Sequence, residues 1–270
     1  MQFNALVGHR RHSCQSGIPG EEAPRPSDIV PLRPDWVRFN WRVLPDLLRV
    51  RTPLVNFHVL KDQSGLVLLD AGFVGGPGCL QNALAKRGWE TEPIAGILLT
   101  HGHLDHILNV ARLARDTGAW IAAPRLDGDR YLGQAKSRGW SRVAGALESI
   151  GRPLLRFGPF TPDRWIGDGD ELEIWSGLRA VHLPGHTAGH TGYYCVSRKL
   201  LFCGDLFASF GRWSHFPPAI LNADPGSMAE SVRKALSLDL AGVIPNHADD
   251  AEPQEHLRRL RVLAGRLRPG

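Results

Sequence analysis

A cluster of histidines at the end of a buried strand restricts the fold of this chain more than any other feature. The apolar segment Ile94 to Leu99 is typical of a strand, and it leads into the run His101-Gly-His103-Leu-Asp105-His106. Apolar residues at helical spacing follow directly. A turn between a strand and a helix can direct several side chains at one point, so the fold must hold these four polar groups together.

The residue types in this run are those that bind divalent transition metals. Imidazole nitrogen and carboxylate oxygen suit Zn²⁺, Fe²⁺ or Mn²⁺. The chain has 12 histidines in 270 residues, so three within six positions is an unusual concentration. The alternative is a solvated polar loop, which that concentration disfavours. We therefore predict a metal site at this turn.

Three further polar residues follow apolar segments in the same way. His186 comes after Leu-Pro-Gly, Asp205 after Leu-Phe-Cys-Gly, and His247 after Val-Ile-Pro-Asn. Strand ends in layered sheet folds present catalytic groups, so we expect these side chains at the same sheet edge as the first cluster. Together the two sets supply five imidazoles and two carboxylates.

On these residues the sequence resembles the metallo-β-lactamase-fold hydrolases, whose signature is His-x-His-x-Asp-His, a later His, an Asp and a last His. The match spans about residues 54–247 and fills all seven positions. The resemblance implies an α+β fold, a four-layer αββα sandwich of two mixed β-sheets flanked by helices, with the site at one sheet edge. It also implies one metal on His101, His103 and His186, a second on Asp105, His106 and His247, and Asp205 as the bridge between them.

The implied ligands suggest a mechanism. Two divalent ions about 3.5–4 Å apart, taken here as Zn²⁺ with Fe or Mn as alternatives, can hold a bridging hydroxide at neutral pH. That hydroxide attacks an electrophilic carbonyl or phosphorus, and the metals stabilise the oxyanion. We predict a catalytic role for Asp105, which can steer the hydroxide and pass a proton to the leaving group.

Two residues outside the seven ligand positions are predicted to support the metal site. Asp70 ends an apolar strand-like segment and fits the family's Asp-x-Gly, so we predict that it hydrogen-bonds a ligand histidine; the alternative is a turn-forming Asp. His190, although close to His186, is expected to be a buried histidine and not a ligand. Trp213, Phe207 and Phe210 follow Asp205 closely and are candidates for an apolar pocket.

Features of particular family branches narrow the reaction. True β-lactamases typically lack an Asp at the bridging position, so Asp205 argues against β-lactam substrates. The glyoxalase II branch carries a glutathione-binding helical domain, for which the 23 residues after His247 are too few. Acyl-homoserine lactonases place a Tyr shortly after the bridging Asp, whereas Leu206 to Phe210 contain none. The basic arm of the tRNA-processing nucleases is not recognised either. We expect a hydrolase of an ester, lactone or thioester.

Three alternatives stay open. The first is a mononuclear iron persulfide dioxygenase of the same fold, which the joint presence of Asp105, His106 and His247 disfavours. The second is a phosphodiesterase or nuclease. The third is a metal-binding module without activity, which the complete ligand set disfavours.

Composition is that of an ordinary globular protein, with 43% hydrophobic and 22% charged residues. The net charge of +5 rests on scattered arginines and is interpreted as a solvated surface. No apolar run has membrane-spanning length and no secretory signal is recognised. We therefore predict a cytoplasmic protein with a small-molecule substrate, no membrane partner and no nucleic-acid partner, and leave a homodimer open. The four cysteines are expected to be thiols.

The chain is divided into a loose N-terminal extension over residues 1–28 and a single domain over residues 29–270. Residues 125–165 are less regular and are predicted to be an insertion that covers the substrate. Strands are predicted at 36–43, 54–60, 66–69, 94–99, 119–123, 172–175, 179–183, 192–196, 200–203 and 240–245. Helices are predicted at 79–86, 107–114, 131–135, 143–150, 253–267 and from 224 onward.

Overall fold

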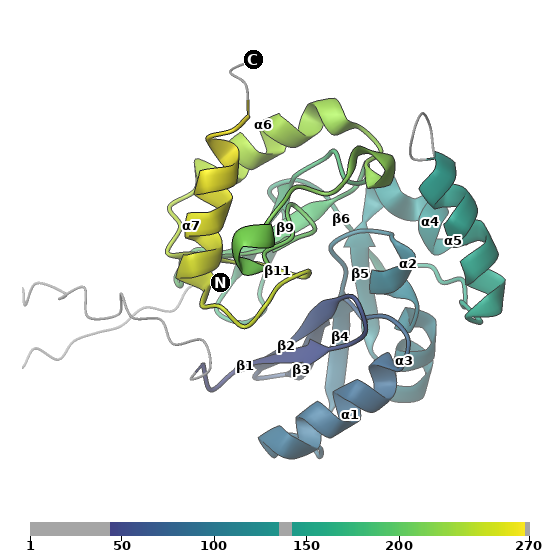
Figure 1. The fold of residues 1–270 in the computed structure, drawn as a ribbon. Coiled ribbons are helices and arrows are strands. Elements are labelled where there is room, and N and C mark those ends of the chain that lie inside the picture. The colour runs from purple at the N-terminus through teal and green to yellow at the C-terminus, as the bar shows by residue number, and fades with distance from the viewer. Residues whose placement is uncertain (1–43, 135–141, 268–270) are drawn as a thin grey trace, which may run out of the picture. The chain divides into compact units, whose positions relative to one another are not determined.

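The computed structural model describes residues 44–134 and 142–267 (Figure 1). The predicted N-terminal extension over residues 1–28 and the strand predicted at 36–43 lie outside the described residues. Within the described part of the chain, none of the helices combines the length and the apolar character needed to cross a bilayer.

The first sheet has six strands in sequence order. The three at one side are antiparallel neighbours, and β3 to β6 run parallel to one another. A tight turn at Gly65, with φ 122°, joins β2 to β3, and a Cβ there would lie 2.6 Å from the carbonyl oxygen of Pro93. The strands are β1 (Leu47–Arg51), β2 (Asn56–Asp62), β3 (Gly65–Leu69), β4 (Ile94–Leu98), β5 (Trp120–Pro124) and β6 (Arg164–Ile166).

The second sheet has five strands in the order β11-β10-β9-β8-β7. Its strands β7 to β10 are antiparallel, whereas β11 joins β10 in parallel. Both sheets are therefore mixed, as predicted. The strands are β7 (Glu171–Leu172), β8 (Leu178–His182), β9 (Thr191–Cys195), β10 (Leu200–Gly204) and β11 (Gly242–Pro245).

Helices cover the outer face of each sheet, so both sheets are buried on two sides (Figure 1). Helices α1 (Gly76–Arg87) and α3 (Val110–Thr117) pack on the first sheet, where Leu80 and Leu113 join one hydrophobic cluster. Helices α6 (Pro225–Leu236) and α7 (Pro253–Ala264) pack on the second through residues such as Val232 and Leu260. A third cluster fills the space between the sheets, including Leu69, Leu98, Tyr193 and Phe202. These layers confirm the predicted αββα sandwich.

Burial on both faces explains why most strands are continuous apolar runs, without polar alternation. The remaining helices are short or lie at the edge of the sandwich. They are α2 (Leu104–Ile107), η3 (Arg125–Asp127), α4 (Gly128–Tyr131), α5 (Arg142–Leu154), η5 (Gly211–Trp213) and η6 (Ala219–Leu221).

Some predicted boundaries are wrong for identifiable reasons. The helix predicted at 107–114 is two helices, because the Asn109 side chain donates hydrogen bonds to the carbonyls of Ala71, Gly72 and Phe73 where α2 gives way to α3. The strand predicted at 172–175 ends at Leu172, since Trp175 and the next residue have positive φ.

Candidate metal centre

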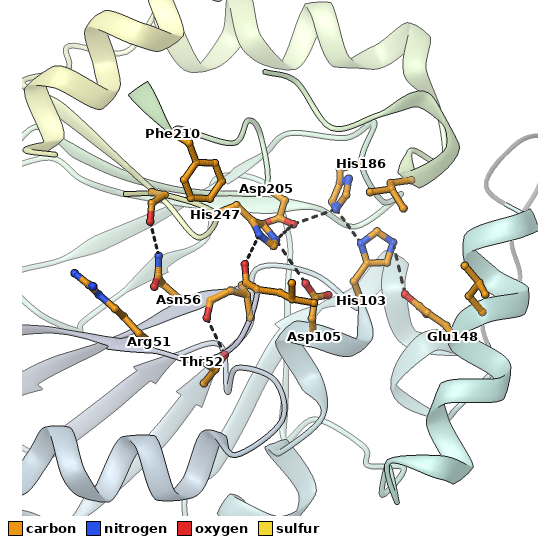
Figure 2. A pocket seen from close by; sticks show the side chains of 15 residues that line it. Arg51, Thr52, Asn56, His103, Asp105, Glu148, His186, Asp205, Phe210 and His247 are labelled. Atoms are coloured by element: carbon orange, nitrogen blue, oxygen red, sulfur yellow. Dashed lines mark hydrogen bonds and ion pairs between the residues drawn. The ribbon is translucent and has the colours of Figure 1, made fainter. Parts of the chain in front are cut away.

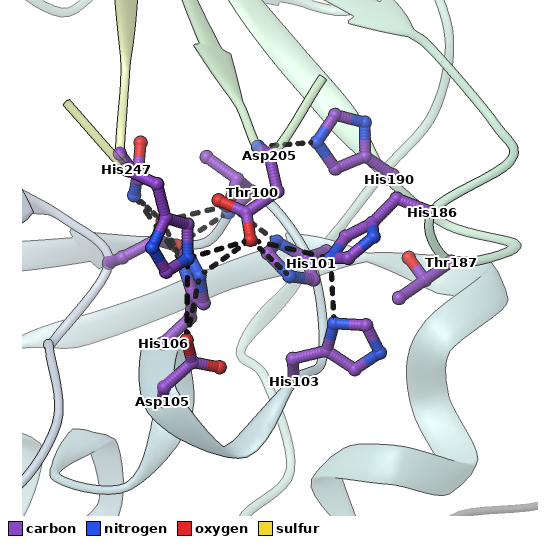
Figure 3. Close-up of polar contacts among 12 residues, drawn as sticks. Thr100, His101, His103, Asp105, His106, His186, Thr187, His190, Asp205 and His247 are labelled. Atoms are coloured by element: carbon purple, nitrogen blue, oxygen red, sulfur yellow. Dashed lines mark hydrogen bonds and ion pairs between the residues drawn. The ribbon is translucent and has the colours of Figure 1, made fainter. Parts of the chain in front are cut away.

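The predicted ligands lie at one edge of the two sheets, at the ends of strands (Figure 3). His101 follows β4, Asp205 follows β10 and His247 follows β11, while His186 lies in the turn between β8 and β9. The three remaining residues of the first run, His103, Asp105 and His106, lie at and within the start of α2. Parallel strands end at the same edge of a sheet, and this places the ligands together.

One carboxylate oxygen, Oδ2 of Asp205, lies at the centre of the cluster. It is 3.1 Å from Nε2 of His247, 3.3 Å from Nε2 of both His106 and His186, and 3.9 Å from Nε2 of His101. Four imidazoles from three parts of the chain therefore face a single carboxylate, an arrangement compatible with the bridging role predicted for Asp205.

The seven side chains fall into overlapping groups whose ligand atoms lie within 4.8 Å of one another. These groups are His101 with His103 and His186, Asp105 with His106 and His247, and His101 with His106 and Asp205. The first two are the sets that the resemblance implied for two separate metals. The third contains the carboxylate predicted to bridge them.

Several ligand atoms lack a hydrogen-bond partner among the described residues although they are buried. They are Nε2 of His101, Nε2 of His106 and Oδ1 of Asp205. A buried polar atom without a partner costs about 1–3 kcal/mol, so three at one point are unfavourable unless another group binds them. Divalent cations are the groups that imidazole nitrogen and carboxylate oxygen bind together, and these residues therefore fit the implied metals.

Asp70 holds the first run of ligands in place through hydrogen bonds to its carboxylate. Its Oδ2 lies 2.9 Å from Nδ1 of His106, and it also accepts hydrogen bonds from the Thr100 hydroxyl and from Nδ2 of Asn246. The Thr100 hydroxyl lies 3.0 Å from Nδ1 of His101. The hydrogen bond predicted between Asp70 and a histidine of the cluster is thus present, and it leaves Nε2 of His106 facing the centre.

The later histidines are held in the same manner. Nδ1 of His186 lies 3.0 Å from Oδ1 of Asn222, whose amide nitrogen donates to the carbonyl of Pro217. Nδ1 of His247 lies 2.8 Å from the carbonyl oxygen of Leu54. Because these oxygens only accept, Nδ1 carries the proton in both rings and Nε2 can offer its lone pair to a metal.

His103 directs its other ring nitrogen, Nδ1, toward the cluster. Its Nδ1 lies 2.8 Å from Nε2 of His186, while its Nε2 lies 3.9 Å from a carboxylate oxygen of Glu148 on α5. Two buried arginines, Arg130 and Arg152, contact the other oxygen of Glu148. The sequence analysis missed Glu148, because a lone Glu on a helix carries no motif.

Asp127 is a second residue that the sequence analysis missed. It is buried, and its carboxylate accepts hydrogen bonds from the backbone N–H of Gly102, the hydroxyl of Thr187 and the backbone N–H of Gly189. It therefore ties the loop of the first two histidines to the loop that carries His186. No local signal distinguishes it from other Asp residues, since its partners lie 25 to 62 positions away.

Without metal, the charges at the site are shared between carboxylates and histidines. Burial raises the pKa of Asp205, but the neighbouring His247 and His106 outweigh it and hold that pKa well below the ordinary value. Burial lowers the pKa of His247, yet Asp205 and Asp105 raise it to about 10. Burial and the neighbouring imidazoles lower the pKa values of His101 and His103. The first pair of ligands is therefore neutral and ready to bind a cation.

A cavity of about 740 Å³ opens over the cluster (Figure 2). Asp105, Asp205, His103, His186 and His247 form its floor, and Leu147 and Glu148 of the predicted insertion line one side. The volume is that of a small-molecule site.

The other predicted neighbours have mixed outcomes. His190 is buried, and its ring contacts the carbonyl of Leu183 and the backbone N–H of Asp205, as expected of a structural histidine.

Phe207 and Phe210 line a second cavity of about 160 Å³ beside the site. Trp213 lines neither cavity and is 70% exposed, so its proposed place in an apolar pocket is wrong. Cys195 and Cys203 are buried thiols, as predicted.

Comparison with known proteins identifies the family. The family model described as the metallo-beta-lactamase superfamily matches residues 51–247, which include every residue of the cluster. The chain therefore belongs to the metallo-beta-lactamase superfamily.

Curated relatives are similar over part of their length. Hydroxyacylglutathione hydrolase GloC of Haemophilus influenzae is 33% identical over 149 residues, covering 52% of this chain and 61% of the relative. A hydroxyacylglutathione hydrolase of Cereibacter sphaeroides is 30% identical over 193 residues, covering 68% of this chain and 62% of the relative. The chain spans about six tenths of the length of these relatives.

A solved structure supports the same fold. The protein TTHA1623, whose crystal structure is of a di-iron-bound form, is 25% identical with a TM-score of 0.59. The likeness covers 79% of this chain and 97% of that one.

Proposed function

We propose that this protein is a metal-dependent hydrolase that uses two divalent ions to cleave an ester, lactone or thioester. The observation that carries the proposal is the convergence of five imidazoles and the carboxylates of Asp105 and Asp205, in overlapping groups of ligand atoms, beneath a small-molecule cavity. Buried histidine nitrogens and a carboxylate oxygen without hydrogen-bond partners support metal binding at this point.

The relatives favour a thioester within that class. Two of them are named hydroxyacylglutathione hydrolases. The small number of residues after His247 disfavours that branch, but these two relatives count against that interpretation. The length of the segment after His247 no longer decides between a thioester and the other substrates.

When bound, two divalent ions supply an activated hydroxide at neutral pH and stabilise developing negative charge. The protein's own residues position the reaction. Oδ2 of Asp105 lies 3.5 Å from Nε2 of His247 and 3.7 Å from Nε2 of His106, and the side chain is partly open to the cavity. Asp105 can therefore orient the attacking group, accept the proton that this group loses and donate it to the leaving group.

The metals are proposed to be Zn²⁺, which suits histidine and carboxylate ligands. Iron is the alternative, and the di-iron form of TTHA1623 supports it. A cytoplasmic location also stays a prediction. Nothing observed supports the homodimer.

The proposal is tested by elemental analysis of the purified protein together with a substrate panel. The panel contains a thioester, a lactone, an aryl ester, a phosphodiester and a persulfide. We expect about two metals per chain and turnover of at least one carbonyl substrate. A single iron with oxygen consumption on the persulfide alone would favour the dioxygenase, and two metals with no turnover at all would favour the metal-binding module.

A further inference from the structure

Leu54, in the turn between β1 and β2, has a conformation that leucine rarely adopts. Its φ is 77°, in the left-handed region, which is strained for a bulky residue. Its side chain is also 75% exposed. Such strain persists where the surrounding structure requires it, and such sites cluster at functional positions.

The backbone of Leu54 has an evident reason for this conformation. Its carbonyl oxygen accepts the hydrogen bond from Nδ1 of His247, and the turn is closed by the Thr52 hydroxyl and N–H donating to the carbonyl of Val55. A Gly or Asn would supply the same carbonyl with less strain, because both tolerate positive φ. The leucine side chain therefore needs a separate explanation.

The Leu54 side chain lines the cavity over the ligand cluster, and three other exposed apolar side chains line the same cavity. Leu147 on α5 is 66% exposed, Phe210 is 41% exposed and Leu221 in η6 is 40% exposed, and all three line the same cavity. A single exposed leucine is ordinary, but four apolar side chains from four separate segments at one cavity are typical of a ligand site.

The charged side chains that line the cavity are paired within the protein or belong to the ligand cluster. Among the residues that line it, Arg51 is the one arginine or lysine, and its guanidinium pairs with Asp250, which also pairs with Arg49. Glu148 pairs with Arg130 and Arg152, and Asp105 lies against His106 and His247 within the ligand cluster. Away from the ligand cluster the wall therefore consists mainly of apolar side chains, which suits an uncharged chain.

We propose that the cavity takes a substrate whose acyl group is an uncharged apolar chain of several carbons, and that Leu54 and Leu147 set the preference for it. This inference rests on the proposed function and names its substrate class. It also assigns two tasks to Leu54: the carbonyl holds His247, and the side chain contacts the chain of the substrate.

The test compares acetyl and hexanoyl thioesters of one neutral thiol on the metal-loaded full-length protein. A methylene in an apolar pocket is worth about tenfold or more where it fits, so we expect kcat/KM to be at least about tenfold higher for the hexanoyl substrate. In Leu54→Asn, which keeps the size and suits the left-handed backbone, this ratio should fall to about threefold or less, mainly through KM. Leu147→Asn should lower it as well.

Leu154→Asn is the matched control. Leu154 is 77% exposed, lies on the same helix as Leu147 and does not line the cavity. We expect its ratio to equal that of the unchanged protein. A wild-type ratio near one, or a Leu54→Asn ratio equal to that of the wild type, would overturn the inference.

A binding measurement separates this inference from the proposed function. An S-hexyl thioether of the same thiol cannot be hydrolysed, and calorimetry gives its Kd without turnover. We expect measurable binding that Leu54→Asn weakens about threefold or more, with bound metal unchanged. If no thioester is hydrolysed but the thioether binds in this way, the proposed function fails and the apolar site stands. If thioesters are hydrolysed and the thioether does not bind, the proposed function stands and the apolar site is overturned.

Discussion

Each of the five imidazoles at the site directs one ring nitrogen to the centre and the other to a fixed oxygen. The outward partners are Thr100, Asp70, Asn222, Glu148 and the carbonyl of Leu54. An outer hydrogen bond sets which nitrogen carries the proton and fixes the plane of the ring. The cluster therefore holds its geometry through residues outside the seven ligand positions, of which Leu54 and Glu148 also line the cavity.

How much of the site the sequence predicts depends on distance along the chain. The ligands are predictable because they follow the ends of four strands, and an apolar segment with a polar residue at its end is a local signal. Asn222 and Glu148 are not predictable in this way, since each lies 36 to 45 positions from the histidine that it contacts. Their residue types are common in helices and loops, so only the folded structure identifies them.

His58 on β2 offers a test of buried titration away from the ligands. Burial, with a smaller contribution from His256, lowers the pKa of His58 to about 3. The unfolded chain protonates a histidine near pH 6.5, so below that pH it binds more protons than the folded protein does. The contribution of neutral His58 to the free energy of unfolding is therefore fully present above pH 6.5 and is lost as the pH falls toward 3.

The variant His58→Phe should reduce this acid sensitivity. Its ring can pack against Phe202, whose centroid lies 5.7 Å from that of His58. We expect the slope of the unfolding free energy against pH, between pH 6.5 and 5, to fall by up to about 1.4 kcal/mol per pH unit. Urea titrations of both metal-free proteins at several pH values measure the slope, and equal slopes would contradict the assignment.

At the scale of elements, the site depends on loops that are tied to one another. The segment around η3 supplies Asp127, which joins the loop after β4 to the loop before β9. The sequence predicts the strands on either side of these loops, because they are apolar on both faces. It misses β1 and β6, which are edge strands with charged residues, LLRVR and RWI.

Asp127→Ala should loosen both loops. It removes the acceptor from the N–H groups of Gly102 and Gly189 and from the hydroxyl of Thr187. Each buried donor left unpaired costs about 1–3 kcal/mol, so we expect a loss of at least about 2 kcal/mol and less bound metal. Urea unfolding and elemental analysis measure these effects.

Asp116→Ala serves as the control for that variant. Asp116 pairs with Arg112 and Arg115 at the exposed surface of α3, where ion pairs contribute little. Its unfolding free energy should stay within about 0.5 kcal/mol of the wild-type value. If the two variants were equally stable, the loop connection assigned to Asp127 would be incorrect.

At the scale of the whole molecule, the cluster of predicted ligands lies where both sheets end, so side chains from the two sheets face each other. A bound ion would connect β4 and α2 of one half to β10 and β11 of the other. Ligands that bind only the folded state stabilise it, by about 2.7 kcal/mol at a concentration 100 times Kd. For a chain of this size that corresponds to about 5–10 °C in Tm.

Chelation should therefore lower the Tm of the wild-type protein by several degrees, and added Zn²⁺ should restore it. Asp205→Ala removes the carboxylate that contacts four of the imidazoles, so its Tm should respond much less. Thermal unfolding followed by circular dichroism, with and without chelator, gives both shifts. An equal response in the two proteins would mean that the metal binds elsewhere.

The central claim is a two-metal hydrolytic centre, and metal titration of the metal-free protein tests it most directly. Zn²⁺ is added in steps while bound metal and hydrolysis of a neutral thioester are both measured. The account predicts that binding and activity saturate together at two ions per chain, and that Asp205→Ala abolishes activity and lowers the binding. Full activity at one ion, or unchanged binding and turnover in Asp205→Ala, would contradict it.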